Sequence, residues 1–159
     1  MTGIHVRRAE EKDISTILRL LTQVCNVHNA GRPDLFRRDQ QKYRADELKI
    51  LIRDDTRPIF VAVDEEDEAK GYGFCVIIDY SGSNVIADRR ELYIDDLCVD
   101  EKERGKGIGG MIFEHIREYA KSKGCYHVTL NVWACNEPAM AFYKSKGMAV
   151  LKTEMEMIL

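Results

Sequence analysis

Hydrophobic and polar positions along the chain follow two periods, and their order predicts alternating strands and helices. Apolar residues spaced three and four apart predict helices; these segments are residues 14–25, 40–52, 108–120 and 136–146. Two-residue alternation and short apolar runs predict strands; these segments are residues 4–7, 59–63, 72–78, 92–99, 126–133 and 148–159. Such mixing of the two element types predicts one α/β domain over residues 1–159.

Two connecting segments and the last strand complete this prediction. Residues 26–39 contain Gly31 and Pro33, which favour a loop, and the acidic run 64–68 is a solvated hairpin turn. The strand predicted for residues 148–159 has no partner strand after it, so it leaves an open sheet edge. We therefore expect a homodimer in which that edge is paired.

The segment around which the chain is organised runs from residue 91 to residue 123. It reads as a buried strand, a charged turn, the glycine-rich loop Arg104–Gly109 and a long amphipathic helix. A glycine loop before a helix brings backbone N–H groups together at the positive end of the helix dipole. This loop is therefore a candidate phosphate-binding site, with two cations beside its glycines.

Two nucleotide-binding motifs are excluded for this loop. Gly105, Gly107 and Gly110 have the spacing of a dinucleotide fingerprint, but the preceding strand ends early, at Val99. No acidic residue ends the strand predicted for residues 126–133, as that motif requires. A Walker loop needs Gly-Lys-Ser/Thr after its glycines, and this chain has Gly-Gly-Met there.

Taken with a second segment, the loop resembles the signatures of the GCN5-related N-acetyltransferases. Arg104–Gly109 matches their Gln/Arg-x-x-Gly-x-Gly/Ala motif fully, and Asn136–Met148 resembles their Asn-x-x-Ala-x-x-Phe-Tyr-x-x-x-Gly-Phe motif. In the second motif Ala139 and Ala141 bracket the usual alanine, and Met148 replaces phenylalanine. The resemblance covers residues 91–147 strongly and the N-terminal half only by the order of its elements.

The resemblance implies a fold and a way of binding acetyl-CoA. It implies a mixed central sheet flanked by about four helices, whose parallel strands, here 92–99 and 126–133, splay apart around the cosubstrate. Backbone groups of Leu97 and Val99 would pair with pantetheine, and Asn136 would contact the cosubstrate from across the gap. The pyrophosphate would accept hydrogen bonds from amides around Gly105, Lys106, Gly107, Ile108 and Gly109, with Arg104 and Lys106 adding positive charge.

The resemblance and the residues together give candidates for acid and base. Tyr143 matches the family tyrosine near the cosubstrate sulfur, where a phenol donates a proton to the leaving thiolate. Asp95 and Asp96 lie in an otherwise apolar strand, where ionised carboxylates are costly without a partner or a task. Strand alternation places them on opposite faces. We expect Asp95, on the face of Tyr93, to act as base through water, and Asp96 to be a buried partner of a helix end or cation. A purely structural role for both stays open.

The acceptor is defined less sharply. The family's loop between the first two helices lines the acceptor site, which makes His28, Arg32 and Phe36 substrate-binding candidates beside Asp95. Short motifs at 93–97 and 136–138 resemble those of small-amine (diamine) acetyltransferases. The expected reaction is direct transfer of acetyl to a primary amine in a ternary complex. Acceptors are a small amine or polyamine, an amino-acid-like molecule, or a protein N-terminus or lysine. The alternative is a catalytically silent CoA-binding regulatory module.

Composition limits the classes of partner and the cellular compartment that we expect for this protein. A formal net charge of −3 and a pI near 5.8 argue against nucleic acid as a partner. Five scattered cysteines without Cys-x-x-Cys spacing are typical of small buried residues in a reducing compartment, and an acyl-cysteine route is disfavoured. With no signal peptide and no apolar stretch long enough for a membrane, we expect a cytoplasmic protein. The histidines lack metal-ligand spacing, so no metal is expected.

Overall fold

The computed structural model describes residues 3–159 as a five-stranded sheet with four α-helices. The elements are β1 (His5–Arg8), α1 (Ile14–Gly31), α2 (Ala45–Leu51), β2 (Ile59–Val63), β3 (Ala69–Asp79), β4 (Arg90–Val99), α3 (Ile108–Ser122), β5 (His127–Leu130) and α4 (Glu137–Ser145). Short 3₁₀ turns occupy Glu11–Asp13 and Glu101–Glu103. Strand order is β1-β2-β3-β4-β5, antiparallel throughout except for the parallel pair β4–β5. The predicted α/β fold with a mixed sheet and about four helices is confirmed.

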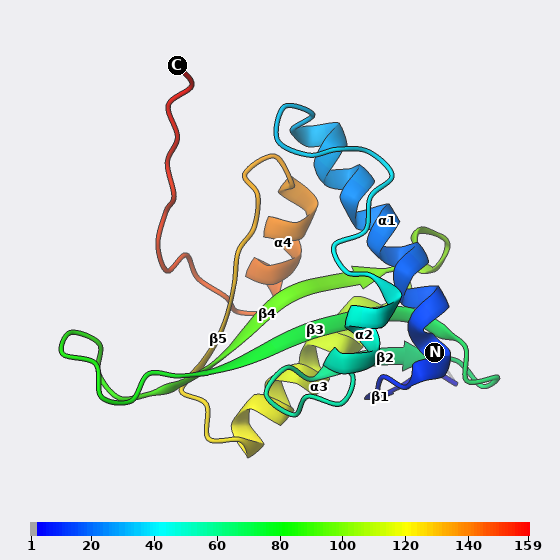
Figure 1. Cartoon of the computed structure of the whole chain (residues 1–159), viewed down its shortest axis with the longest axis horizontal. Coiled ribbons are helices and arrows are strands. Elements are labelled where there is room, and N and C mark those ends of the chain that lie inside the picture. Colours follow the sequence, from blue (N-terminus) through cyan, green and yellow to red (C-terminus); the bar gives the residue numbers. More distant parts are fainter. Residues whose placement is uncertain (1–2) are drawn as a thin grey trace.

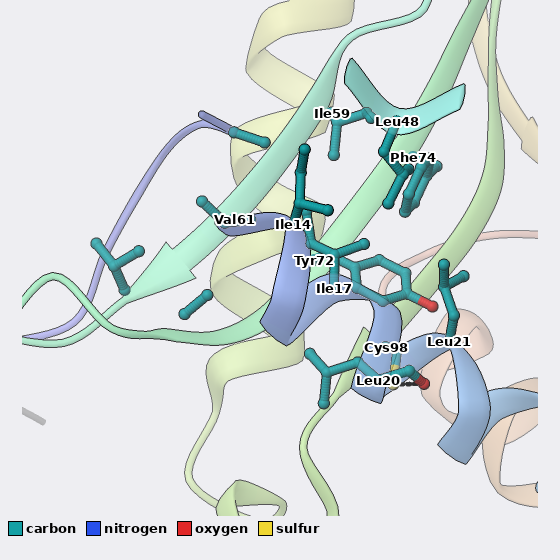
Figure 2. Close-up of a cluster of buried hydrophobic side chains, with 13 residues drawn as sticks. Ile14, Ile17, Leu20, Leu21, Leu48, Ile59, Val61, Tyr72, Phe74 and Cys98 are labelled. Atoms are coloured by element: carbon teal, nitrogen blue, oxygen red, sulfur yellow. Dashed lines mark hydrogen bonds between the residues drawn. The ribbon is translucent and has the colours of Figure 1, made fainter. Parts of the chain in front are cut away.

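Helices cover the two faces of the sheet separately. Figure 1 shows α1 and α2 on the near face and α3 on the far face. Alternation along β2 serves both layers, since Val61 packs with α1 and α2 whereas Phe60 packs against α3. Figure 2 shows the first layer, in which Tyr72 lies among Ile17 and Leu21 of α1. The sheet lies between these two packed layers, which together hold its strand β4 in position.

The first helix is longer than its sequence indicated. The loop predicted for residues 26–39 is wrong in its first part, because α1 continues through Gly31. Its last turn is closed by a hydrogen bond from the Arg32 amide to the His28 carbonyl (2.8 Å), and Pro33 follows. The irregular segment is held to α1 by Asn29, whose side-chain amide donates to the Phe36 carbonyl (2.6 Å). Local helix-breaking preference is therefore overridden by contacts formed across the loop.

Three other boundaries differ from the prediction. Helix α2 begins at Ala45 rather than near residue 40, and β5 ends at Leu130 rather than at residue 133. Residues 148–159 were expected to form a strand, but they are extended without pairing to the described sheet. Figure 1 shows this C-terminal segment, in red, running beside β5 and α4 and away from the sheet. The pattern of the segment is that of a strand, yet the segment forms no ladder with the described sheet.

Strands β4 and β5 form a fork. Their pairing covers only Glu91↔His127 to Ile94↔Leu130, although β4 continues to Val99. We call Glu91–Ile94 the closed half of β4 and Asp95–Val99 its open half. Figure 1 shows the two strands diverging from their common start. This divergence is the splay that the sequence predicted.

Candidate active site

The open half of β4 presents unpaired backbone groups to the gap. On its other side β4 pairs with β3, and the Asp100 amide just beyond its end donates to the Lys70 carbonyl (2.9 Å). Because backbone groups alternate along a strand, those of Leu97 and Val99 point the opposite way, toward the gap. The Val99 carbonyl accepts there from Arg104 Nε at 3.2 Å. The gap thus offers an edge to which an extended ligand can add like a strand.

A β-bulge places Asp95 and Asp96 differently from the prediction. Phe74 of β3 pairs with Asp96 and Cys75 pairs with Ile94, so Asp95 is the extra residue of the bulge. Both carboxylates therefore reach residues on the α1–α2 side of the sheet, and the expectation that they occupy opposite faces is wrong. A bulge inserts one residue without a partner and shifts the alternation by one. The fork begins at this bulge, immediately after Ile94.

Asp95 is held by two donors from the segment before α2. Lys42 Nζ lies 2.8 Å from one carboxylate oxygen, and the Tyr43 hydroxyl donates to the other at 2.6 Å. Burial, followed by this hydrogen bond, raises the pKa of Tyr43. The Asp95 side chain is only 17% exposed, whereas Lys42 is 47% exposed, so the ion pair is partly open to water. Asp95 therefore ties the bulge to the loop after α1.

Asp96 has a different environment. One hydrogen bond reaches its carboxylate from a side chain, donated by the Tyr72 hydroxyl at 2.9 Å. Burial raises the pKa of Asp96 to about 6, against the opposing effects of that hydrogen bond and of Lys42. The expected partner, a helix end or a cation, is instead a tyrosine of β3. A carboxyl group with a pKa near neutrality can exchange protons at physiological pH.

Tyr143 faces the open half from α4. Burial raises the pKa of its phenol, and the nearby Asp96 and Cys98 raise it further. Its ring packs against Phe142 and Phe113, at centroid distances of 5.1 and 6.1 Å. Within residues 3–159, no protein partner forms a hydrogen bond with its hydroxyl. The phenol is therefore protonated at neutral pH, and Asp96 is near enough to influence its pKa.

The glycine loop presents backbone amides to the same gap. Gly105 and Gly107 have φ values of 80° and 82°, a conformation that glycine adopts without the penalty of a side chain. Gly107 begins α3, and the first hydrogen bond of the helix runs from the Met111 amide to the Gly107 carbonyl (3.1 Å). The amides from Gly105 to Gly110 precede that bond. They are the unsatisfied donors of a helix N-terminus, to which a phosphate binds.

Helix α1 anchors the start of this loop. The buried Asp100 carboxylate accepts from Arg19 (2.7 Å) and from the side chain of Gln23 (3.3 Å). Gln23 in turn accepts from the Glu101 amide at 3.1 Å. Of the two loop cations, Arg104 bonds to Val99 and Lys106 to Glu103 (2.6 Å). These contacts fix the loop in position before any ligand binds.

Asn136, a predicted cosubstrate contact, has a structural role as well. It precedes α4, and its side-chain oxygen accepts from the Ala139 amide at 3.3 Å. This is an N-cap interaction, which satisfies one of the free amides of the helix. Its side-chain NH₂ group is a remaining donor, so the cap does not prevent a contact with a ligand in the gap.

Two of the predicted acceptor residues, His28 and Phe36, form an aromatic cluster with Trp133. His28 and Phe36 are 4.8 Å apart between ring centroids, and Trp133 lies 4.9 Å from Phe36. Trp133, after β5, is 41% exposed, so it is a wall of this aromatic cluster and not a core anchor. Burial and the charge of Lys42 lower the pKa of His28.

Arg32, the other predicted acceptor residue, is engaged at the surface. It pairs with Asp34 on its own loop and with Glu156 of the C-terminal segment. It therefore connects the loop after α1 to the last residues of the chain.

Sequence reasoning missed several residues of the site. Lys42, Tyr43 and Tyr72 contact the two aspartates, and Gln23 holds the glycine loop. For Tyr72, the sequence indicated only a buried residue of a strand. No pattern in the sequence pairs residues 24 to 78 positions apart, so these contacts required the fold.

Comparisons with known proteins identify the class to which this fold and site belong. Residues 9–148 match the acetyltransferase (GNAT) family. Thialysine N-epsilon-acetyltransferase of Bos taurus is 31% identical over 151 residues, which cover 92% of this chain and 85% of that protein. The peptidyl-lysine N-acetyltransferase YjaB of Salmonella typhimurium is 34% identical over 110 residues, or 68% of this chain and 62% of that protein.

A solved structure agrees with the sequence comparisons. A mutant of the BH1408 protein from Bacillus halodurans is 34% identical and superposes with a TM-score of 0.93, over 98% of this chain and 99% of that one. The chain belongs to the GNAT family of N-acetyltransferases, and it is an acyltransferase. Of residues 3–159, no helix has the length and apolar character to cross a membrane.

Proposed function

We propose that this enzyme transfers the acetyl group of acetyl-CoA to a primary amine by direct transfer in a ternary complex. The observation that carries the proposal is the open half of β4. Its unpaired edge ends in a glycine loop with free amides, it contains Asp96, and Tyr143 packs in the same core layer as its Leu97 and Val99. A strand-like arm with a diphosphate at one end and a thioester at the other fits that arrangement.

The binding of acetyl-CoA would use the chain in two places. The amides of residues 105–110 would donate to the diphosphate, where the dipole of α3 adds positive potential. The backbone groups of Leu97 and Val99 would pair with the pantetheine arm, and Arg104 would leave the Val99 carbonyl to approach phosphate. Acetyl-CoA supplies the acetyl thioester. The loop needs little rearrangement because α1 already holds it through Asp100.

Proton transfer would fall to Asp96 and Tyr143. A primary amine must lose a proton as its nitrogen bonds to the acetyl carbon, and Asp96 would accept that proton through a water molecule. The C–S bond then breaks, and Tyr143 would give its proton to the departing sulfur. Asp95, the base expected from the sequence, is less suited because Lys42 and Tyr43 occupy both of its oxygens. It would position the bulge instead.

The acceptor would enter past the aromatic cluster of His28, Phe36 and Trp133. Aromatic faces attract ammonium groups and pack on alkyl chains, and Asp95 and Asp96 lie beneath with negative charge. Two relatives are named for lysine-type amino groups, thialysine and peptidyl-lysine. We therefore place an amine on a flexible alkyl arm first. A polyamine and a protein N-terminus remain in the acceptor panel.

The decisive experiment measures release of free CoA from acetyl-CoA by chromatography, with and without each amine. The panel contains thialysine, lysine, spermidine, a lysine peptide and a peptide with a free N-terminus. We expect at least one amine to raise CoA release well above the amine-free rate, with the acetylated amine detected by mass. CoA binding without turnover on any amine would contradict the proposal and favour the regulatory module.

A matched pair of tyrosine variants tests the proposed acid. Tyr143→Phe removes the phenol near Asp96, and we expect kcat to fall roughly 10- to 100-fold. Tyr119→Phe is the control, because Tyr119 on α3 packs edge-on against Phe60 of β2, which is separated from β4 by β3. Equal rates in the two variants would remove Tyr143 from the mechanism.

We also propose that the working form is a homodimer in a reducing compartment such as the cytoplasm. The support for the first is the unpaired C-terminal segment. All five cysteines are free thiols, which is compatible with the second.

A further inference from the structure

The segment between α1 and α2 places an amine of the protein itself at the fork. Lys42 Nζ lies 2.8 Å from a carboxylate oxygen of Asp95 and 3.5 Å from the Asp95 carbonyl oxygen, so it is held against the backbone of β4 at the bulge. Figure 1 shows the segment, in cyan, returning along α1 toward the sheet. The Lys42 side chain is 47% exposed, so solvent reaches an amine that lies where the open half begins.

The surroundings of this amine are those proposed for an acceptor. Burial lowers the pKa of His28, and the charge of Lys42 lowers it further. Burial raises the pKa of Asp96, and the Tyr72 hydrogen bond and the charge of Lys42 oppose that rise. Lys42 Nζ is therefore within electrostatic reach of the aromatic cluster and of both carboxylates. Within residues 3–159, the other lysines that form ion pairs have partners outside β4.

The fork also brings this amine to the reacting end of the proposed donor. The glycine loop follows the C-terminal end of β4. With its diphosphate at that loop, an arm paired along Val99 and then Leu97 runs toward Asp95, and its thioester would lie near the bulge. A lysine ammonium is carried on a flexible four-carbon stem, so Lys42 Nζ can leave the Asp95 carboxylate and approach a carbonyl carbon beside it.

We propose that Lys42 is a self-acetylation site, to which the enzyme transfers the acetyl group of acetyl-CoA when no amine acceptor is bound. The inference rests on the proposed function, since it needs the same donor, base and acid. Its product is an amide, which carries no charge and cannot form the ion pair with Asp95. The modification would therefore free the Asp95 carboxylate and remove a competing amine from the acceptor site.

The atoms of this step balance without a further reactant. The Lys42 ammonium releases one proton to water, and its nitrogen then bonds to the acetyl carbon. As that bond forms, the nitrogen gives a second proton to Asp96 through a water molecule. The C–S bond breaks, and the sulfur takes a proton from Tyr143 and leaves as free CoA. Asp96 then returns its proton to water and Tyr143 recovers one, so the products are acetyl-lysine, CoA and one proton.

Spontaneous acetylation should have the opposite selectivity. An ammonium held by a carboxylate keeps its proton and is a poor nucleophile, so acetyl-CoA acting without catalysis should modify other surface lysines first. Lys49, which is exposed on α2, is such a lysine. A preference for Lys42 over Lys49 therefore distinguishes transfer in the site from background chemistry.

Peptide mass spectrometry of the full chain gives the first test. The purified enzyme is incubated with acetyl-CoA and no amine, and acetylation of each lysine is followed in time. We expect Lys42 to be acetylated at least about tenfold faster than Lys49. Lys42→Arg, which keeps a cation beside Asp95, should remove the fast-forming acetylated species from the intact mass, and Lys49→Arg should leave it unchanged. Equal rates at the two lysines, or a fast species that survives Lys42→Arg, would overturn the inference.

Variants of the proposed base and acid connect the modification with the site. Asp96→Asn and Tyr143→Phe should each slow acetylation of Lys42 at least about tenfold, without changing the rate at Lys49. Chains with Lys42→Arg keep Asp96, and chains with Asp96→Asn keep Lys42, so mixing the two should not speed acetylation of Lys42. Faster acetylation in the mixture would place the transfer between two chains, and an undiminished rate in either variant would place it outside the site. Both results contradict the inference.

Added amines separate this inference from the proposed function. An amine that raises CoA release should slow acetylation of Lys42, because both amines would use one place beside Asp95 and Asp96; acetylation indifferent to a saturating amine would contradict that shared place. Turnover of an added amine while Lys42 stays unmodified would refute self-acetylation alone. Absence of both turnover and Lys42 acetylation would refute the two proposals together.

Discussion

The two halves of strand β4 differ in how their backbones are paired and in the side chains that they carry. The closed half, Glu91–Ile94, is paired on both edges and buries Leu92 and Ile94 against α3. The open half, Asp95–Val99, is paired on one edge only and begins with a bulge that brings two carboxylates to one side. Where strand pairing continues, the backbone N–H and C=O groups bond to the neighbouring strand. Where pairing stops, the same groups are free to bind a ligand. The fork is therefore the boundary between the half of β4 that holds the sheet together and the half that can bind a ligand.

The largest expected effect lies in the open half, at Asp96. Asp96→Asn keeps the size of the side chain and an acceptor for Tyr72, but it cannot take a proton. We expect kcat/KM to fall at least about 100-fold at pH 8, as loss of a general base does. In the unmutated enzyme kcat/KM should rise with pH and level off above about 6, where Asp96 becomes ionised. The variant should lose that dependence, measured as a pH–rate profile.

Asp95→Asn is the control within the same bulge. It weakens the ion pair with Lys42 but leaves Asp96 in place, so we expect less than a tenfold loss and an unchanged pH profile. The reverse ranking would restore Asp95 as the base.

The raised pKa of Asp96 also predicts the direction in which stability changes with pH. Its folded pKa lies above the unfolded value of about 4, so the folded state binds this proton more tightly. Stability from this group is therefore present below pH 4 and is lost as pH rises through about 6. Asp96→Asn should raise the melting temperature at pH 8 and leave it unchanged at pH 4. A lower melting temperature at pH 8 would contradict the assigned burial of an ionised carboxylate.

Sequence predicted the two halves unequally. The apolar run located β4 and the glycine loop located the candidate phosphate site, because both signals are local. The bulge at Asp95 is invisible in the pattern: Tyr93, Asp95 and Leu97 alternate as an unbroken strand would. Only the register against Phe74 and Cys75 shows the shift. The carboxylates are therefore candidates that the sequence proposed, but their expected placement on opposite faces is wrong.

The same limit explains the other differences. The helical pattern stops at Cys25, but α1 continues to Gly31, where the following loop is tied back to the helix. Residues 148–159 have the alternation of a strand, and alternation does not reveal which chain supplies the neighbouring strand. Contacts between distant segments decide such cases, and one sequence carries no record of them.

A substitution in the closed half should change the stability of the protein rather than its activity. Leu92 is completely buried, and Leu92→Ala removes three carbon atoms from the layer under α3. We expect a loss of about 3 kcal/mol in the free energy of unfolding, measured by urea denaturation. Well below the unfolding transition, KM for acetyl-CoA should change less than twofold. A large increase in KM with unchanged stability would show that the halves are not separable.

Glycine substitutions in matched conformations sharpen the comparison at the end of the open half. Gly107 and Gly82 have φ values of 82° and 75°, and added Cβ atoms would meet nothing within 4 Å at either position. Alanine should therefore cost a similar amount of stability at both, about 1 kcal/mol. Only Gly107→Ala should raise KM for acetyl-CoA, roughly tenfold, because it moves the amides at the start of α3. Equal KM values in both variants would exclude the loop from binding.

The smallest expected effect is at the closed end of the fork. The buried Glu91 lies 2.9 Å from His127 Nε2 across the parallel pair, and it accepts from the Tyr80 hydroxyl at 3.3 Å. Glu91→Gln keeps the shape and the tyrosine contact but removes the charge that faces the imidazole. We expect a loss of about 1 kcal/mol in stability, the size of one hydrogen bond. Because Leu92 and Ile94 still hold the strands together, kcat and its pH profile should not move. A change in either would mean that this contact sets the angle of the fork, and that the closed half acts on the chemistry as well as supporting it.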